Sequence, residues 1–358
     1  MLISGTNHEH IKALTGLRFV AAIIVVVCHW RAADLLHFPR WLFDAVDGGT
    51  NSVALFFVLS GFILIYNYSN LSGRGNVIKY LVSRFARIWP VVVLSLALGS
   101  IGVIYAALHG TSEFSAAALG ASLLAQLFMV TAWAPFAGIQ VPWNGPAWSI
   151  ACEAFFYCLF PMILTLLRRR STRVILAIIG TAWLAQLGWV ALLWKLEEGE
   201  PRLYWVIIRS PVTHLPEFIL GVGAGLWFLR HGSLLTPNWR NALIASSLAG
   251  VVTFSLWRPV TPNHLFITPF FCVLIVALAA RPKRAESVLG WRPIVLLGEA
   301  SFSLYMIHVP LLRIYQVAGL ESAAWGATTV GLTVILSVFV FRAYETPMRL
   351  AIRRRVGV

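Results

Sequence analysis

Charge is scarce in this sequence. Only 12% of its 358 residues are Asp, Glu, Lys or Arg, and 14 residues in all are acidic. A soluble domain has about 25% charged residues, and no polar block here is long enough to form such a domain. Hydrophobic residues make up 59% of the chain, and an apolar run of about 18 residues can cross a bilayer as a helix. We therefore predict an all-α, polytopic transmembrane helix bundle that forms one domain over residues 1–358.

Cysteine is also scarce, and its pattern excludes a disulfide framework. The four cysteines, Cys28, Cys152, Cys158 and Cys272, lie inside apolar segments and form no C-x-x-C pair. We expect them to be small apolar packing residues.

Acidic residues are too few to balance the basic ones, so the net charge is +14. Because the basic residues cluster beside apolar runs and form no soluble module, we expect membrane orientation rather than binding of nucleic acid.

Eleven apolar segments stand out along the chain. They cover residues 13–30, 52–68, 88–108, 115–133, 147–167, 174–194, 204–229, 241–257, 264–280, 296–317 and 323–343. The first segment has no small-residue cleavage site, so we expect a retained helix rather than a signal peptide. Basic loops lie at 69–87, 168–173, 230–240 and 281–292, and the tail after 349 is also basic. The positive-inside rule places these loops in the cytoplasm.

The basic loops create a parity problem. Three apolar segments lie between 69–87 and 168–173, yet two loops on one side of a membrane are separated by an even number of crossings. The segment 115–133 is the weakest candidate, because it starts with Ala, Gly and Ser and precedes a Pro/Trp/Gly loop. We predict about ten crossings, one re-entrant or interfacial segment and two cytoplasmic termini. Eleven crossings are the alternative if the rule fails locally.

Two ionisable residues lie near the ends of the first apolar run. Arg18 and His29, in GLRFVAAIIVVVCHW, are eleven positions apart. Eleven helical residues rise about 16 Å and complete about three turns, so both side chains lie on one stripe. An ionisable group in a membrane is costly unless it faces a partner or a wet cavity. We predict functional roles for both, with an interfacial Arg18 and a hydrogen-bonded His29 as structural alternatives.

Two further motifs combine polar residues with helical spacing. In SRFARIWP, Arg84 and Arg87 share one helix face, where two guanidinium groups could bind phosphates bidentately. The alternative is a basic loop that only sets the orientation of the chain in the membrane.

In NGPAWSIACEAFFY, Ser149 and Glu153 are four positions apart. We expect Glu153 at the depth of His29, where the two could act as orienter and base; a hydrogen bond between helices is the alternative.

Later stretches carry weaker signals. In GEASFSLYMIHVP, Ser301, Tyr305 and His308 share a face, for which helix packing is the alternative to a substrate contact. The stretches HLPEFILG, with His214 and Glu217, and YETPMR, residues 344–349, favour helix-end caps.

In FFVLSGFIL, small residues are typical of close helix packing, although Ser60 could also line a site.

Taken in this order, the motifs resemble those of the acyltransferase-3 family of integral membrane acyltransferases. The resemblance covers roughly residues 11–349, from the Arg18–His29 pair to YETP. Members of that family O-acylate bacterial surface and exported polysaccharides, and some act on small molecules. The chain departs from many relatives at Thr15 and Ala154, where those relatives carry acidic residues. Glu153 is therefore the only carboxylate in its motif.

The resemblance implies a multi-pass enzyme of the bacterial inner membrane. Its donor would be an acyl-CoA, most often acetyl-CoA, and its acceptor a hydroxyl of a glycan or lipid-linked saccharide, with no metal. An acyltransferase for a small diffusible molecule and a transporter with intramembrane charges are the alternatives.

On this hypothesis, each motif residue has a role. Arg84 and Arg87 bind CoA phosphates and Arg18 contacts the donor. His29 acts as general base or transient acyl carrier, and Glu153 orients it. Substrate contacts are expected from the remaining motif residues, which are Ser60, Trp148, Ser149, Tyr305 and His308.

Overall fold

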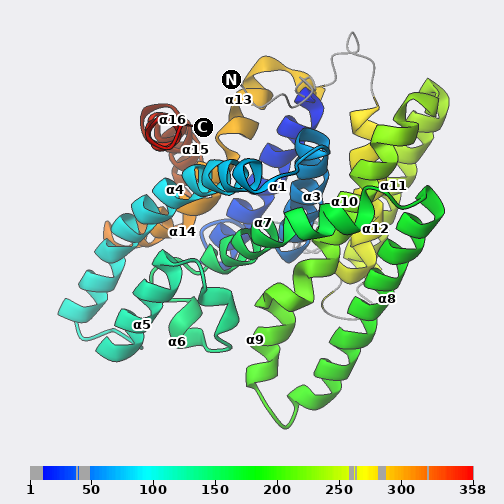
Figure 1. Ribbon diagram of the computed structural model, residues 1–358. Coiled ribbons are helices and arrows are strands. Elements are labelled where there is room, and N and C mark those ends of the chain that lie inside the picture. Colours follow the sequence, from blue (N-terminus) through cyan, green and yellow to red (C-terminus); the bar gives the residue numbers. More distant parts are fainter. Residues whose placement is uncertain are drawn as a thin grey trace.

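The computed structural model describes residues 11–37, 39, 49–257, 262, 264–280, 288–320 and 322–357. Within these residues the chain forms helices, turns and loops and no strand, so the prediction of an all-α protein is confirmed (Figure 1). Residues 281–287 of the basic loop at 281–292 lie outside the described part. The four cysteines are free thiols, as predicted.

The α-helices pack into one bundle. In chain order they are α1 (Lys12–Ala32), α3 (Gly49–Tyr68), α4 (Arg74–Leu108), α5 (Ala116–Leu127), α6 (Ala137–Gln140), α7 (Ala147–Leu167), α8 (Thr172–Glu197), α9 (Arg202–Arg209), α10 (Pro211–His231), α11 (Pro237–Trp257), α12 (His264–Ala279), α13 (Arg292–Glu299), α14 (Ser301–Val317), α15 (Ala323–Val340) and α16 (Thr346–Arg355).

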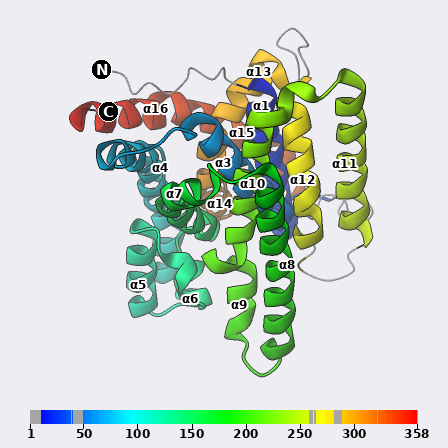
Figure 2. The same ribbon diagram turned by 45° about the vertical axis from the view of Figure 1, so that its right-hand side comes forward.

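Several helices are long and apolar enough to cross a membrane. Among the described residues, seven segments meet this condition, or eight if α13 and α14, which meet at a 61° bend, form one span. A multi-pass membrane protein is therefore supported. The segment that we expected not to cross forms α5, whose 12 residues rise about 18 Å, short of the hydrocarbon core of about 30 Å. It lies beside α6 at one end of the bundle (Figure 2).

Residues 74–87 of the basic segment 69–87 are helical, contrary to our prediction of a loop, and only residues 69–73 form a turn. Helix α4 starts at Arg74 and continues through Pro90 for 35 residues. A proline inside a helix removes one backbone hydrogen bond and crowds the carbonyl group four residues earlier, which kinks a helix without always ending it. Arg84 and Arg87 therefore project from a helix that extends beyond the apolar segment.

The last helix also continues further than predicted. Helix α15 passes through a π-helical turn, Phe341–Glu345, directly into α16. The prediction of a helix-end cap at 344–349 is therefore wrong. The start of α1 and the whole of α16 lie at one end of the bundle, and α5, α6 and α9 lie at the other (Figures 1 and 2).

Helices α3 and α10 cross at the centre of the bundle with their backbones in contact. A Cβ atom on Gly61 would lie 2.3 Å from the carbonyl oxygen of Phe218, and one on Gly221 would lie 2.0 Å from that of Val58. Glycine is required at both positions, because any side chain would separate the helices. The small residues of FFVLSGFIL thus serve helix packing, and this contact sets the positions of the helices that surround the site.

Candidate active site

A buried cavity lies between helices α1, α3, α7 and α14. Its volume is about 40 Å³, and it is lined by Arg18, Val53, Phe56, Phe57, Ser149, Ile150, Glu153, Ser301, Phe302 and Tyr305. Its polar residues come from three helices that are far apart in the sequence. With Phe56 and Phe57 of FFVLSGFIL, the cavity therefore joins parts of four of the predicted motifs in one space.

His29 and His308 form a pair beside this cavity. The His29 Nδ1 and His308 Nε2 atoms are 3.3 Å apart, and the two ring centroids are 4.9 Å apart. The ring of Tyr305, which lines the cavity, lies 5.6 Å from that of His308. Helices α1 and α14 thus bring together two histidines that are 279 positions apart in the chain.

Backbone carbonyl groups determine which nitrogen of each ring carries a proton. His308 Nδ1 donates to the carbonyl oxygen of Tyr305 at 2.5 Å, and His29 Nδ1 lies 2.9 Å from that of Val25. A carbonyl oxygen can only accept, so both Nδ1 atoms carry hydrogen in the neutral rings. His308 Nε2 is then an acceptor for His29 Nδ1. The remaining nitrogen, His29 Nε2, has a free lone pair and no hydrogen-bond partner among the described residues.

The position of Glu153 differs from our expectation. Its carboxylate accepts hydrogen bonds from Ser60, at 3.1 Å, and from Tyr157, and it does not contact His29. Ser149 lies one turn earlier on α7, with its Oγ 2.8 Å from the Tyr305 hydroxyl. Ser149 therefore lies near the histidine pair, and Glu153 is about 6 Å further along the helix. The contact that we assigned to Glu153 is made by His308.

The three arginines that we assigned to the donor gather at the Glu153 end of the cavity. Arg18 lines the cavity, and the Arg84 guanidinium lies over the rings of Tyr68 and Tyr157 and donates to the Tyr68 hydroxyl at 2.9 Å. The Nε atoms of Arg18 and Arg84 are buried and have no hydrogen-bond partner among the described residues. Buried donors without partners are costly, and an anionic ligand would satisfy them.

A second carboxylate belongs to this group, and our sequence reading missed it. Glu345 is buried and accepts a hydrogen bond from Ser303 at 2.6 Å. It lies close enough to Arg18, Arg87 and Arg349 for their charges to interact. The signal was an acidic residue next to an apolar helix in YETP, which we interpreted as a cap. Four guanidinium groups here face two carboxylates, so the region has an excess of positive charge.

Two residues that we did not predict hold the loop before α7 against α14. Asn144 Nδ2 donates to the carbonyl oxygen of Met306 at 2.9 Å. Arg313 donates to the carbonyl oxygens of Val141, at 3.2 Å, and of Pro142. No sequence pattern distinguished either residue. Their effect is to place the start of α7, including Ser149, against the histidine pair.

Trp148 does not line the cavity. Its ring packs against Phe57, at 6.2 Å, and His214, at 5.2 Å. Ser60 is buried and acts through its hydrogen bond to Glu153. Of the five residues predicted to contact substrate, Ser149 and Tyr305 reach the cavity directly.

The chain belongs to the acyltransferase-3 family. The profile of that family, described as an acyltransferase domain, matches residues 11–342, which include the whole cavity. The chain is therefore an acyltransferase, in agreement with the predicted enzyme class.

Several proteins with similar sequences are acyltransferases by name. Acyltransferase MdmB of Streptomyces mycarofaciens is 26% identical over 374 residues, which cover 96% of this chain and 93% of that protein. O-acetyltransferase OatA of Staphylococcus aureus (strain NCTC 8325 / PS 47) is 24% identical, covering 95% of this chain and 57% of the relative. Peptidoglycan O-acetyltransferase OatA of Listeria monocytogenes is 22% identical, covering 96% and 56%. The chain thus spans a little over half the length of the OatA proteins. No solved structure matches it significantly.

Proposed function

We propose that this protein transfers an acyl group, most readily acetyl, from acyl-CoA to a hydroxyl of a surface or exported glycan. The observation that carries the proposal is a cavity lined by Arg18, from the arginine cluster, and by Tyr305, whose ring lies 5.6 Å from that of His308 in the histidine pair. One end offers positive charge to a phosphorylated donor. The other offers an imidazole nitrogen with a free lone pair.

The donor end suits the phosphates of CoA. Guanidinium groups bind phosphate oxygens bidentately, and Arg18 and Arg84 hold buried Nε donors without partners in the described part of the chain. Arg87 adds a third guanidinium, close enough to Arg18 for the two positive charges to repel each other, and a bound phosphate would relieve that repulsion. We place this end at the cytoplasmic side of the inner membrane, where acyl-CoA is available. Arg18 and His29 are eleven positions apart on α1, so the acyl group would travel about 16 Å along that helix.

The histidine end suits general base catalysis. His29 Nε2 accepts the proton of the acceptor hydroxyl as its oxygen attacks the thioester carbonyl. The tetrahedral intermediate then collapses, the C–S bond breaks, and the CoA thiolate takes the proton from the His29 imidazolium. His308 stabilises that imidazolium by accepting from Nδ1. The Tyr305 and Ser149 hydroxyls line the cavity and bond to each other and to the carbonyl oxygen of Pro146. Rotation of one hydroxyl away from Pro146 would let it donate to the developing oxyanion.

The proposal that the acceptor is a glycan rests on the name of a similar protein and not on the shape of the cavity. The Listeria protein is named a peptidoglycan O-acetyltransferase, and its similarity covers nearly all of this chain. A polymer acceptor would approach from the end of the bundle where α5, α6 and α9 lie, opposite α16 (Figure 1).

The test compares surface polysaccharide from cells without the gene and from cells complemented with each variant. We expect ester-linked acetyl to be restored by the wild type and by His109→Ala, which changes an exposed histidine, but not by His29→Ala. Protein abundance in membranes is measured in parallel. Equal ester content with and without the gene would reject a glycan acceptor, and full restoration by His29→Ala would reject the base.

A further inference from the structure

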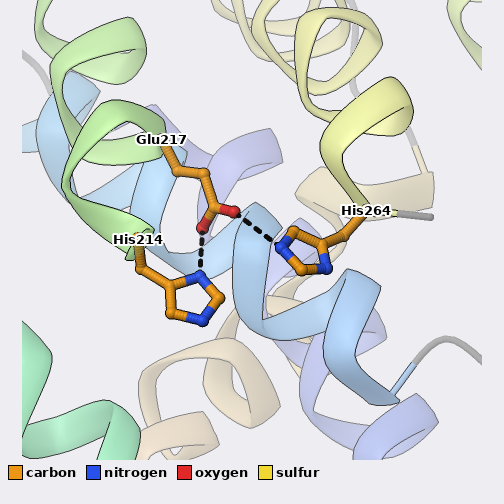
Figure 3. Close-up of side chains that lie close together, drawn as sticks. All are labelled: His214, Glu217 and His264. Atoms are coloured by element: carbon orange, nitrogen blue, oxygen red, sulfur yellow. Dashed lines mark hydrogen bonds and ion pairs between the residues drawn. The ribbon is translucent and has the colours of Figure 1, made fainter. Parts of the chain in front are cut away.

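A second polar cluster lies in the bundle outside the cavity. His214 and Glu217 of α10 and His264 at the start of α12 have side chains that are fully buried, each 0% exposed (Figure 3). His214 Nδ1 is 3.1 Å from Glu217 Oε2, and His264 Nε2 is 3.2 Å from Glu217 Oε1. Our prediction of a helix-end cap at His214 and Glu217 is therefore wrong. The carboxylate lies between two imidazole rings from different helices.

The His214 ring presents a lone pair to the carboxylate. Its Nε2 lies 3.1 Å from the carbonyl oxygen of Ile208 and must donate there, because a carbonyl can only accept. In the neutral ring, Nδ1 then carries no hydrogen, although it faces a carboxylate oxygen that also accepts. Two acceptors 3.1 Å apart require a cation between them, which is either a proton or a metal ion.

The His264 ring lacks satisfactory hydrogen bonds. Neither of its nitrogens has a hydrogen-bond partner among the described residues, because the 3.2 Å approach to Glu217 does not have hydrogen-bond geometry. A fully buried imidazole without hydrogen bonds is unfavourable. A metal ion would satisfy Nε2, since coordination uses the lone pair and needs no N–H directed at an oxygen.

We propose that His214, Glu217 and His264 bind a Zn²⁺ ion, although the family resemblance implied no metal. Two imidazoles and a carboxylate are a donor set that Zn²⁺ uses, and one ligand atom from each residue lies within 4.8 Å of the others. Zn–N and Zn–O distances of about 2.0–2.2 Å place tetrahedral ligand atoms about 3.3 Å apart. The His214 Nδ1–Oε2 separation of 3.1 Å and the His264 Nε2–Oε1 separation of 3.2 Å are close to that value. Because they involve different oxygens of Glu217, the carboxylate would bind the ion through both oxygens.

The surroundings provide the outer contacts that a metal site needs. Ile208 orients His214, and Gln186 Nε2 of α8 donates to Glu217 Oε1 at 3.2 Å and to the carbonyl oxygen of Thr213 at 2.9 Å. Such partners fix the orientation of metal ligands. The Gln186 Oε1 atom is buried without a partner in the described part and is available as a further oxygen near the site.

The burial of all three ligands indicates a structural ion rather than a catalytic one. The ion would link α10 to α12 and, through Gln186, to α8. The rings of Phe57 and Trp148 pack on His214 at 5.3 and 5.2 Å, and Trp148 precedes Ser149 of the cavity. The site thus stabilises the helices that support one wall of the active site.

The test is the metal content of the full-length protein. The chain is produced with a histidine-free affinity tag in medium supplemented with Zn²⁺, purified in detergent and analysed by plasma mass spectrometry. We expect about one Zn²⁺ per chain. The content should fall at least tenfold in His264→Gln and in His214→Gln, and stay unchanged in His109→Ala. Less than a tenth of an equivalent in the wild type would overturn the proposal and leave a protonated His–Glu–His cluster.

A second measurement uses the wild-type protein alone, so it does not depend on whether the histidine variants fold. Wild-type protein is treated with a chelator, and its melting temperature is measured before and after addition of Zn²⁺. A bound ion stabilises the folded state, so we expect the melting temperature to fall and then recover. Co²⁺ added to the chelated protein should give the visible absorption of a tetrahedral site. No change in melting temperature and no such absorption would also overturn the proposal.

Discussion

The replacement of His308 by Ala is the sharpest test of the histidine pair. The substitution removes the acceptor that lies 3.3 Å from His29 Nδ1 and leaves only the carbonyl oxygen of Val25. The loss of this hydrogen bond matters most when His29 has taken the proton of the substrate hydroxyl, because the bond is then made by a charged ring. Such bonds contribute about 1.5–3 kcal/mol, which corresponds to a decrease of about 10- to 150-fold in kcat.

The assay is transfer of labelled acetyl from acetyl-CoA by purified protein or membranes, with kcat and KM determined separately. We expect the KM for acetyl-CoA to stay within about twofold, because the arginine cluster is unchanged. His308→Gln, which restores an acceptor, should recover part of the rate. His29→Ala should cost about 10²- to 10⁴-fold, as expected for a lost general base.

The double variant separates a positioning role from an independent one. If His308 acts only through His29, the activity of His29→Ala should not fall further when His308→Ala is added. A kcat for His308→Ala within twofold of the wild type, at normal protein abundance, would refute the reasoning. A higher KM with an unchanged kcat would refute the reasoning as well.

Three other predictions follow from the contacts described above. Arg84→Ala should weaken acetyl-CoA binding at least tenfold by calorimetry, whereas Arg74→Ala, at the exposed start of α4, should not; equal affinities would remove the donor assignment. Gly221→Val should lower the melting temperature of the detergent-solubilised protein or prevent its accumulation, because even a Cβ would lie 2.0 Å from the carbonyl oxygen of Val58; normal stability would contradict the close helix contact. Arg313→Ala removes the hydrogen bonds that hold the loop before α7, so kcat should fall by about tenfold. The affinity for acetyl-CoA should change little. An unchanged kcat would show that the loop holds its position without Arg313.

Part of the site was predictable because it depends on spacing within one helix. Arg18 and His29 share a stripe of α1, and Arg84 and Arg87 share a face of α4, as the helical repeat requires. The arginines that we grouped as donor residues do lie near one another. The partner of His29 was not predictable in this way, because it comes from α14, and the depth of Glu153 depends on how α7 lies against its neighbours.

The sequence by itself determined the class of this protein. Its long apolar runs and scarce charges indicate a membrane helix bundle, because a helix makes all of its backbone hydrogen bonds within one segment. The order of its motifs indicates the family. Only the tertiary structure decided which polar groups meet: His29 with His308, Glu153 with Ser60 and Tyr157, and His264 with Glu217. The physical reason is that periodicity is a local property of a helix. The choice of neighbouring helices and their tilt come instead from close packing of the whole bundle, as at the backbone contact of α3 with α10.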